Sequence, residues 1–181
     1  MKIALFGNEF SQNYVKYIKH LIQKLEDKDI QILIHQQFFD FLQESIDFND
    51  SIQIFERISK QDNIDFLFSI GGDGTLLRAV TYVRESNIPI LGINTGRLGF
   101  ISSISTDQID DAVDNVLNGN YKIRNRTVLE LATENNLFGT TNFALNEVAI
   151  VKKDTSSMIR VDAFIDNEFL NSYWADGLLI S

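Results

Sequence analysis

The sequence predicts an α/β fold: a domain built on a parallel sheet over residues 1–120, followed by the start of an all-β domain over residues 121–181. As far as about residue 118, short apolar runs alternate with segments whose apolar residues share one helical face. That alternation is typical of a parallel sheet covered by helices. After residue 121, only strand-like runs separated by polar turns follow. A chain of 181 residues, 44% of them hydrophobic, has room for one generous domain or one domain and part of another.

Short apolar runs mark the expected strands of the first domain. They are 2–6, 30–34, 65–70 and 88–93. Helices are expected from Ser11, as the capping residue, to about Asp27, then after Thr75, and again over 107–118.

Two further segments of this domain have less regular patterns. The aromatic-rich segment 38–42 predicts a helix or a loop that lies in the core. The segment 51–60 is predicted to be a helix.

The second part of the chain is predicted to contain strands and no helix. The expected strands are 127–133, 143–151, 159–165 and 177–181. Because the sequence stops inside the last of these apolar runs, we expect it to be a fragment that lacks the rest of the β domain.

The composition excludes several classes of protein. Sixteen Lys and Arg against 25 Asp and Glu give a net charge of −9, which argues against a nucleic-acid or anionic-membrane partner. The absence of cysteine excludes disulfides, zinc–thiolate sites and Fe–S clusters, and two histidines exclude a His-rich metal site. No apolar run approaches the ~18–20 residues of a membrane span. We therefore expect a cytoplasmic protein.

The most informative segment is Gly71-Gly72-Asp73-Gly74-Thr75, which lies between a predicted strand and a predicted helix. Glycines allow a ligand to approach the backbone closely, and successive N–H groups at a helix N-terminus bind anions. A phosphate is the natural ligand, so residues 1–120 are predicted to be a nucleotide-binding domain. The helix dipole and N–H groups should keep Asp73 ionised, ready to orient a hydroxyl or hold Mg²⁺ through water. The alternative is a simple glycine turn in which Asp73 caps the helix.

This loop resembles the one shared by diacylglycerol kinases, phosphofructokinases and NAD kinases. Three further stretches resemble NAD kinases of the bacterial type: the glycine-containing segment 91–100, Asn146-Glu147-Val148, and 175–181. The four motifs occur in the order of that family, and the resemblance covers essentially the whole chain. The resemblance implies transfer of a phosphoryl group from ATP, another nucleoside triphosphate or polyphosphate to the 2′-hydroxyl of the adenosine ribose of NAD, which gives NADP.

The resemblance also implies roles for individual residues. Asp73 corresponds to the proton acceptor for the 2′-hydroxyl and, with Gly74, contacts NAD. Arg78 corresponds to a basic residue that reaches toward a phosphate, Asn146 and Glu147 to the pair that binds adenosine, and Asp176 to an aspartate near nicotinamide. A divalent metal, expected to be Mg²⁺, accompanies ATP, and no set of protein metal ligands is assigned. The family's usual self-association implies a homo-oligomer for the full-length protein.

Alternatives stay open at this point. Arg78 could be a solvated surface arginine, Asn146 and Glu147 a polar pair at a strand edge, and Asp176 part of a turn. At the level of function, a lipid kinase with the same glycine loop and a non-catalytic nucleotide-binding fragment are the rivals. We expect the 181-residue chain alone to be inactive as a kinase.

Overall fold

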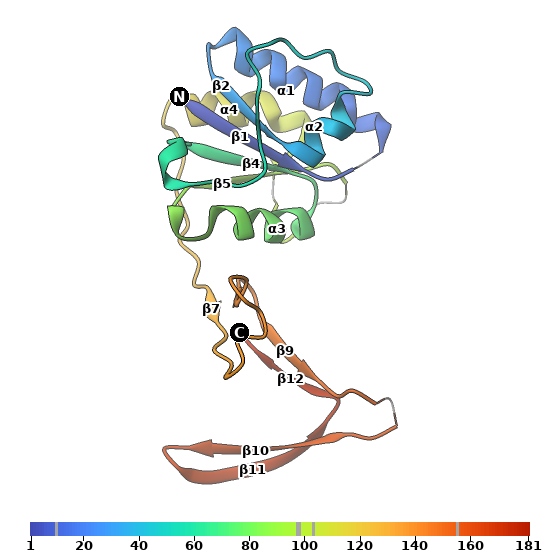
Figure 1. Ribbon diagram of the computed structural model, residues 1–181, viewed down its shortest axis with the longest axis vertical. Helices are drawn as coiled ribbons and strands as arrows, with labels where there is room; N and C mark the ends of the chain where they lie inside the picture. Colours follow the sequence, from blue (N-terminus) through green and yellow to red (C-terminus); the bar gives the residue numbers. More distant parts are fainter. Residues whose placement is uncertain (10, 97–98, 103, 155) are drawn as a thin grey trace. The chain divides into compact units, whose positions relative to one another are not determined.

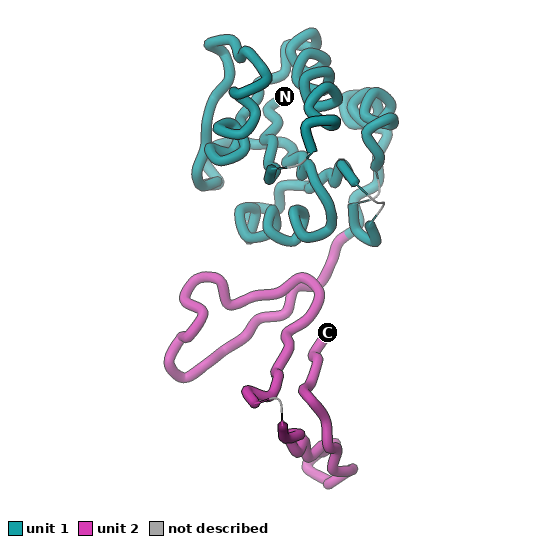
Figure 2. Tube along the Cα trace, turned by 90° about the vertical axis from the view of Figure 1, so that its right-hand side faces the viewer, with its two compact units in different colours: residues 1–124 teal, residues 125–181 magenta. Residues whose placement is uncertain are grey.

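The computed structural model describes residues 1–181 apart from 10, 97, 98, 103 and 155. It divides into two compact units, residues 1–124 and residues 125–181, which are coloured separately in Figure 2. Each unit is described by itself below. None of the helices in the described residues is long and apolar enough to cross a membrane.

The first unit contains a six-stranded sheet with the strand order β3-β2-β1-β4-β5-β6. All of its strand pairs are parallel. The predicted α/β fold with a parallel sheet is therefore confirmed. The strands are β1 (Lys2–Gly7), β2 (Gln31–His35), β3 (Gln53–Phe55), β4 (Phe66–Ile70), β5 (Ile90–Asn94) and β6 (Ile104–Ser105).

Different helices cover the two faces of the sheet (Figure 1). The helices α1, α2 and α4 pack on one face, where they bury Leu5 and Phe68. The helix α3 packs on the other face, where it covers Phe6 and Leu67. Central strands covered on both sides are mostly apolar, and every residue of β4 is buried, including the polar Ser69. The helices are α1 (Val15–Asp27), α2 (Gln36–Leu42), α3 (Asp73–Val83) and α4 (Ile109–Leu117).

Single 3₁₀ turns lead into or follow several of these elements. They are η1 (Gln12–Tyr14), η2 (Lys60–Asp62), η3 (Arg84–Ser86) and η4 (Thr106–Gln108). The first of them corrects the predicted start of the first helix. The Ser11 side chain makes no capping hydrogen bond, and its carbonyl accepts the N–H of Tyr14 at 2.9 Å, so the chain enters α1 through η1.

The predicted helix over 51–60 is wrong. This segment contains the edge strand β3, which pairs with β2, and then a bend that leads to η2. Pairing with β2 makes β3 the second strand on that side of β1, and tertiary pairing of this kind overrides a weak local pattern. The segment 38–42 lies in α2, and Phe38 and Leu42 are fully buried there, as expected for the core.

The described residues of the second unit form strands and no helix, and the strands make three antiparallel pairs: β7 with β8, β9 with β12, and β10 with β11. The predicted all-β character is confirmed. The predicted strand 127–133 is confined to two residues, the predicted strand 143–151 is interrupted, and β11 was not predicted. The strands are β7 (Leu129–Glu130), β8 (Phe143–Ala144), β9 (Val148–Val151), β10 (Ile159–Ile165), β11 (Glu168–Ala175) and β12 (Gly177–Ile180).

Candidate functional site

The order of the strands locates a crevice between the carboxyl ends of β1 and β4. These strands are neighbours, yet β1 continues toward α1 on one face and β4 into α3 on the other. Open α/β sheets bind ligands where the connections diverge in this way. The predicted phosphate loop follows β4 directly and therefore lies at this crevice.

The glycines of this loop serve different purposes. Gly71 has a φ of +150°, and a Cβ atom there would lie 2.8 Å from Thr75 Cβ, so the backbone itself requires glycine. A Cβ at Gly72 or Gly74 would meet nothing within 4 Å. Both positions are exposed, and the fold leaves space beside each of them. A ligand that approaches the backbone would account for the missing side chains at Gly72 and Gly74.

The Asp73 carboxylate accepts three backbone hydrogen bonds from a second loop, the one that follows β5. Phe100 N–H donates to Oδ2 at 2.8 Å, while Ile101 and Ser102 N–H groups donate to Oδ1 at 3.1 and 2.9 Å. The N–H groups of Ser102 and Phe100, helped by that of Ile101, lower the pKa of Asp73 below its ordinary value. Asp73 is thus ionised, as expected, but the donors belong to another loop.

The capping alternative for Asp73 is not what the structure contains. The N-cap residue of α3 is Gly72, no side chain makes a capping hydrogen bond, and Asp73 is the first helical residue. Its carboxylate binds the second loop at a point where Gly99 leaves room for it. A Cβ atom at Gly99 would lie 2.6 Å from Asp73 Cγ. Arg97 and Leu98, which belong to the same predicted motif, lie outside the described residues.

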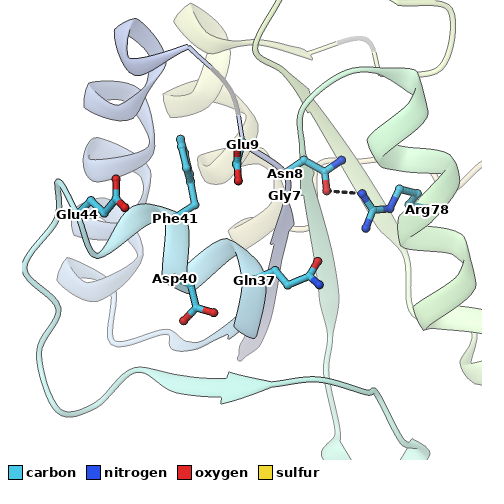
Figure 3. A pocket seen from close by; sticks show the side chains of 8 residues that line it. All are labelled: Gly7, Asn8, Glu9, Gln37, Asp40, Phe41, Glu44 and Arg78. Carbon is cyan, nitrogen blue, oxygen red and sulfur yellow. Dashed lines mark hydrogen bonds between the residues drawn. The ribbon is translucent and has the colours of Figure 1, made fainter.

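Arg78 lies one turn along α3 and points toward Asn8, the residue after β1 (Figure 3). Arg78 Nη1 donates to Asn8 Oδ1 at 2.8 Å, and Asn8 Nδ2 donates to Thr75 Oγ1 at 3.5 Å. Arg78 is exposed, but it is held by this contact and is not simply a solvated side chain. Sequence analysis missed Asn8, because Gly7-Asn8 reads as the end of a strand. Its position after the first strand of a parallel sheet is the signal that could have identified it.

Asn8 and Arg78 line a cavity of about 850 Å³ between the end of β1, α2 and α3 (Figure 3). Three carboxylate residues and one cation contribute to its wall, so its surroundings are mainly acidic. The lining residues are Gly7, Asn8, Glu9, Gln37, Asp40, Phe41, Glu44 and Arg78.

The predicted site residues of the second unit lie at opposite ends of one ribbon. Asn146 and Glu147 directly precede β9, whose first residue pairs with Ile180, while Asp176 directly precedes β12, whose first residue pairs with Val151. Four or five residues of antiparallel strand separate the two ends by about 15 Å. Asp176 also forms an ion pair with Lys152, with Oδ1 and Nζ 2.6 Å apart. The structure thus brings Gly71, Gly72, Asp73, Gly74, Thr75 and Arg78 together in the first unit, and it separates Asp176 from Asn146 and Glu147 in the second.

Within the described residues, no group of three or more His, Cys, Asp or Glu side chains could hold a metal ion. The acidic face of α4 is partly neutralised instead, because Lys24 lies 3.1 Å from Asp110 and 2.9 Å from Asp114.

The fold is that of an open α/β protein in which a glycine loop joins a central strand to a helix, the arrangement that many nucleotide-binding proteins use to hold phosphate. The model of the ATP-NAD kinase N-terminal domain matches residues 3–121, and this chain belongs to that family. The predicted family resemblance is therefore confirmed.

Several NAD kinases of bacteria are similar in sequence to this chain over its whole length. The chain is 45% identical over 182 residues to the NAD kinase of Cytophaga hutchinsonii, and 42% identical over 184 residues to that of Flavobacterium johnsoniae. Each match covers 100% of this chain but only 62% and 63% of those proteins, respectively. The chain thus spans less than two thirds of the length of these relatives.

Two solved structures share the fold. The crystal structure of yeast NADH kinase complexed with NADH matches with a TM-score of 0.78 at 20% identity, over 99% of this chain and 56% of that one. An NAD kinase from Archaeoglobus fulgidus in complex with ATP matches with a TM-score of 0.67 at 24% identity, over 99% of this chain and 59% of that one. At these identities the likeness concerns the fold alone.

Proposed function

We propose that this chain carries the phosphoryl-transfer site of an NAD kinase. The reaction would move the terminal phosphoryl group of ATP to the 2′-hydroxyl of the adenosine ribose of NAD and release ADP and NADP. Family membership favours this reaction over lipid phosphorylation. The observation that carries the proposal is the Asp73 carboxylate, which is held ionised between two glycine loops at the crevice of the sheet.

Asp73 would orient the attacking hydroxyl. An ionised carboxylate has about four acceptor positions, and the three N–H groups of the second loop use three of them. Oδ2, with one such bond, has room for a hydroxyl donor. The 2′-oxygen would attack the γ-phosphorus, the bond to the β–γ bridging oxygen would break, and the hydroxyl proton would pass to Asp73 and then to solvent. Because its pKa is low, Asp73 is a weak base, so proton transfer occurs late and orientation is its main contribution.

The transferred phosphoryl group carries negative charge that this acidic chain must balance locally. The N–H groups at the start of α3 and the guanidinium of Arg78 would bind phosphate oxygens there. Mg²⁺ in kinase sites is held mainly by substrate phosphates and water, and no side chain of this protein is assigned to it, because the open acceptor position of Asp73 is given to the hydroxyl. When bound, Mg²⁺ would neutralise phosphate charge. We expect EDTA to abolish NADP formation.

Further roles are proposed for the second unit and the whole protein. Asn146 and Glu147 would bind the adenosine of NAD and Asp176 would lie near nicotinamide, which agrees with their separation along the β9–β12 ribbon. The complete protein would work in the cytoplasm as a homo-oligomer. Exposed Phe164, Phe169 and Trp174 in β10 and β11 are consistent with such an assembly.

The test is NADP formation from NAD, ATP and Mg²⁺, followed with an NADP-specific dehydrogenase, on this chain and on the longest product of its gene. Asp73→Asn is expected to lower turnover by about 10² to 10⁴-fold and to change NAD affinity by less than about tenfold. Asp111→Asn, on the exposed side of α4, is the matched control and should leave both unchanged. Titration of Asp73 should cause no loss of activity between about pH 8 and 6, since its pKa is lowered.

Two outcomes would contradict the proposal. If neither form of the protein makes NADP, the assigned reaction is wrong. If Asp73→Asn abolishes NAD binding together with turnover, Asp73 is a structural residue and not the acceptor of the hydroxyl proton.

A further inference from the structure

Asn8 connects two parts of the phosphate-binding region through its side chain. Its oxygen accepts a hydrogen bond from Arg78 Nη1 at 2.8 Å, and its nitrogen lies 3.5 Å from Thr75 Oγ1. A guanidinium has only donors, so the amide oxygen must face Arg78 and the amide nitrogen must face Thr75. The side chain of Asn8 therefore has one orientation that serves both neighbours, as Figure 3 illustrates for Arg78.

A second contact fixes the same arginine. The guanidinium carbon of Arg78 lies 6.0 Å from the centre of the Phe6 ring, within the range of a cation–π interaction. Phe6 is fully buried and packs 5.0 Å from the His35 ring and 4.7 Å from the Tyr82 ring. The arginine thus rests against a rigid aromatic group and is held at its tip by Asn8.

The chemical nature of this support matters for anion binding. None of the ion pairs among the described residues includes Arg78, although Glu9, Asp40 and Glu44 line the same cavity. A neutral amide oxygen fixes the guanidinium without neutralising its charge. An aspartate at position 8 would have nearly the same shape, but it would form an ion pair with Arg78 and compete with a phosphate.

We propose that Asn8 is a positioning residue that holds Arg78 and Thr75 in place for a phosphate group while leaving the positive charge of Arg78 available. This inference rests on the proposed function only for the identity of the phosphate, which would belong either to ATP or to NAD. Asn8 acts through Arg78 and need not touch the substrate itself.

The experiment measures binding of inorganic tripolyphosphate and of NAD to the 181-residue chain by calorimetry. Asn8→Asp is expected to weaken tripolyphosphate binding at least tenfold, as Arg78→Ala does, and Asn8→Ala is expected to weaken it about threefold. In the Arg78→Ala background, Asn8→Asp should cause little further loss, because its effect passes through Arg78. Asn63→Asp is the matched control: it adds the same charge on an exposed residue before β4, at the opposite edge of the sheet. Thermal unfolding verifies that each variant folds.

Several results would overturn the inference. It fails if the unaltered chain does not bind tripolyphosphate at millimolar concentration, or if Asn8→Asp binds it as the unaltered chain does. It also fails if Asn8→Asp weakens tripolyphosphate binding as much in the Arg78→Ala background as in the unaltered chain. The loss then comes from direct repulsion between the new carboxylate and the anion. A loss confined to tripolyphosphate assigns the phosphate to the donor, and a loss of both tripolyphosphate and NAD binding assigns it to a position that both substrates reach. If the coupling to Arg78 is found and no NADP is formed, the role of Asn8 stands and the proposed function falls.

Discussion

Residues 1–124 and 125–181 differ in where their apolar side chains lie. All buried hydrophobic side chains among the described residues belong to the first unit, for example Phe68 in β4. The second unit exposes large apolar side chains such as Phe164, Phe169 and Trp174. The first unit covers both faces of its sheet with helices, whereas the second consists of two-stranded ribbons, which are marginally stable by themselves. The first unit therefore contributes most of the folding stability, while the residues predicted to bind substrates are divided between the two units.

The largest expected difference between the two units is in the free energy of unfolding when one phenylalanine is removed from each. Phe68→Ala should lower the free energy of unfolding by about 3–5 kcal/mol, because it leaves a cavity in a central strand. Phe164→Ala, at 60% exposure, should lower it by about 1 kcal/mol or less. Urea denaturation followed by circular dichroism measures both. Equal losses would show that the second unit has a core of comparable importance.

Within the first unit, two glycines of the same loop are expected to have different roles, one in stability and one in binding. Gly71→Ala should lower the free energy of unfolding by about 1–3 kcal/mol, because the φ of +150° and the contact with Thr75 exclude a side chain. Gly74→Ala should leave stability unchanged or raise it by up to about 1 kcal/mol, since Gly74 lies inside α3 with open space around it. The same Gly74→Ala change should reduce NADP formation at least tenfold. Denaturation and the coupled assay give the two values, and a Gly74→Ala protein with full activity would remove the reason for glycine at that position.

The smallest expected effect lies in the second unit. Lys152→Ala removes the ion pair with Asp176, whose side chain is 80% exposed. Solvent screens such pairs, so the free energy of unfolding should change by at most about 0.5 kcal/mol. If Asp176 contributes to NAD binding, NAD affinity should respond more than stability does. Calorimetric titration with NAD beside a denaturation curve tests this, with Lys153→Ala as the neighbouring control.

The sequence predicted the parallel sheet because strands buried on both sides are mostly apolar, as in β4, where Ser69 is the one polar residue. The prediction from sequence failed for two strands, β3 and β11. The strand β3 has one buried residue, Phe55, and exists because β2 offers it a partner. In β11, apolar residues do not alternate with polar ones, and only the Asp166-Asn167 turn, with φ values of 51° and 67°, signals a hairpin. The boundary between predicted domains at 120/121 stays a prediction.

For the candidate site, the place of Gly71-Gly72-Asp73-Gly74-Thr75 between a strand and a helix was predicted correctly. Its role in binding an anion stays a prediction. The partners of Asp73 were not predictable, because they are backbone groups that lie 27 to 29 residues away and carry no sequence signal. Asn8 was missed for a related reason: its partners Thr75 and Arg78 lie 67 and 70 residues away and meet it only when β1 pairs with β4.

From those sequence separations we expect the two parts of the site to form at different stages of folding. Asp73 and its three donors belong to one contiguous β–α–β segment, 66–102, so the bonds between the two glycine loops require closure of only a short loop. The contacts of Asn8 close a much longer one, and folding rates fall as contacts become less local. We therefore expect the carboxylate that would accept the hydroxyl proton to be fixed by a local folding event. The arginine that would bind phosphate should reach its final position only when the first strand enters the sheet.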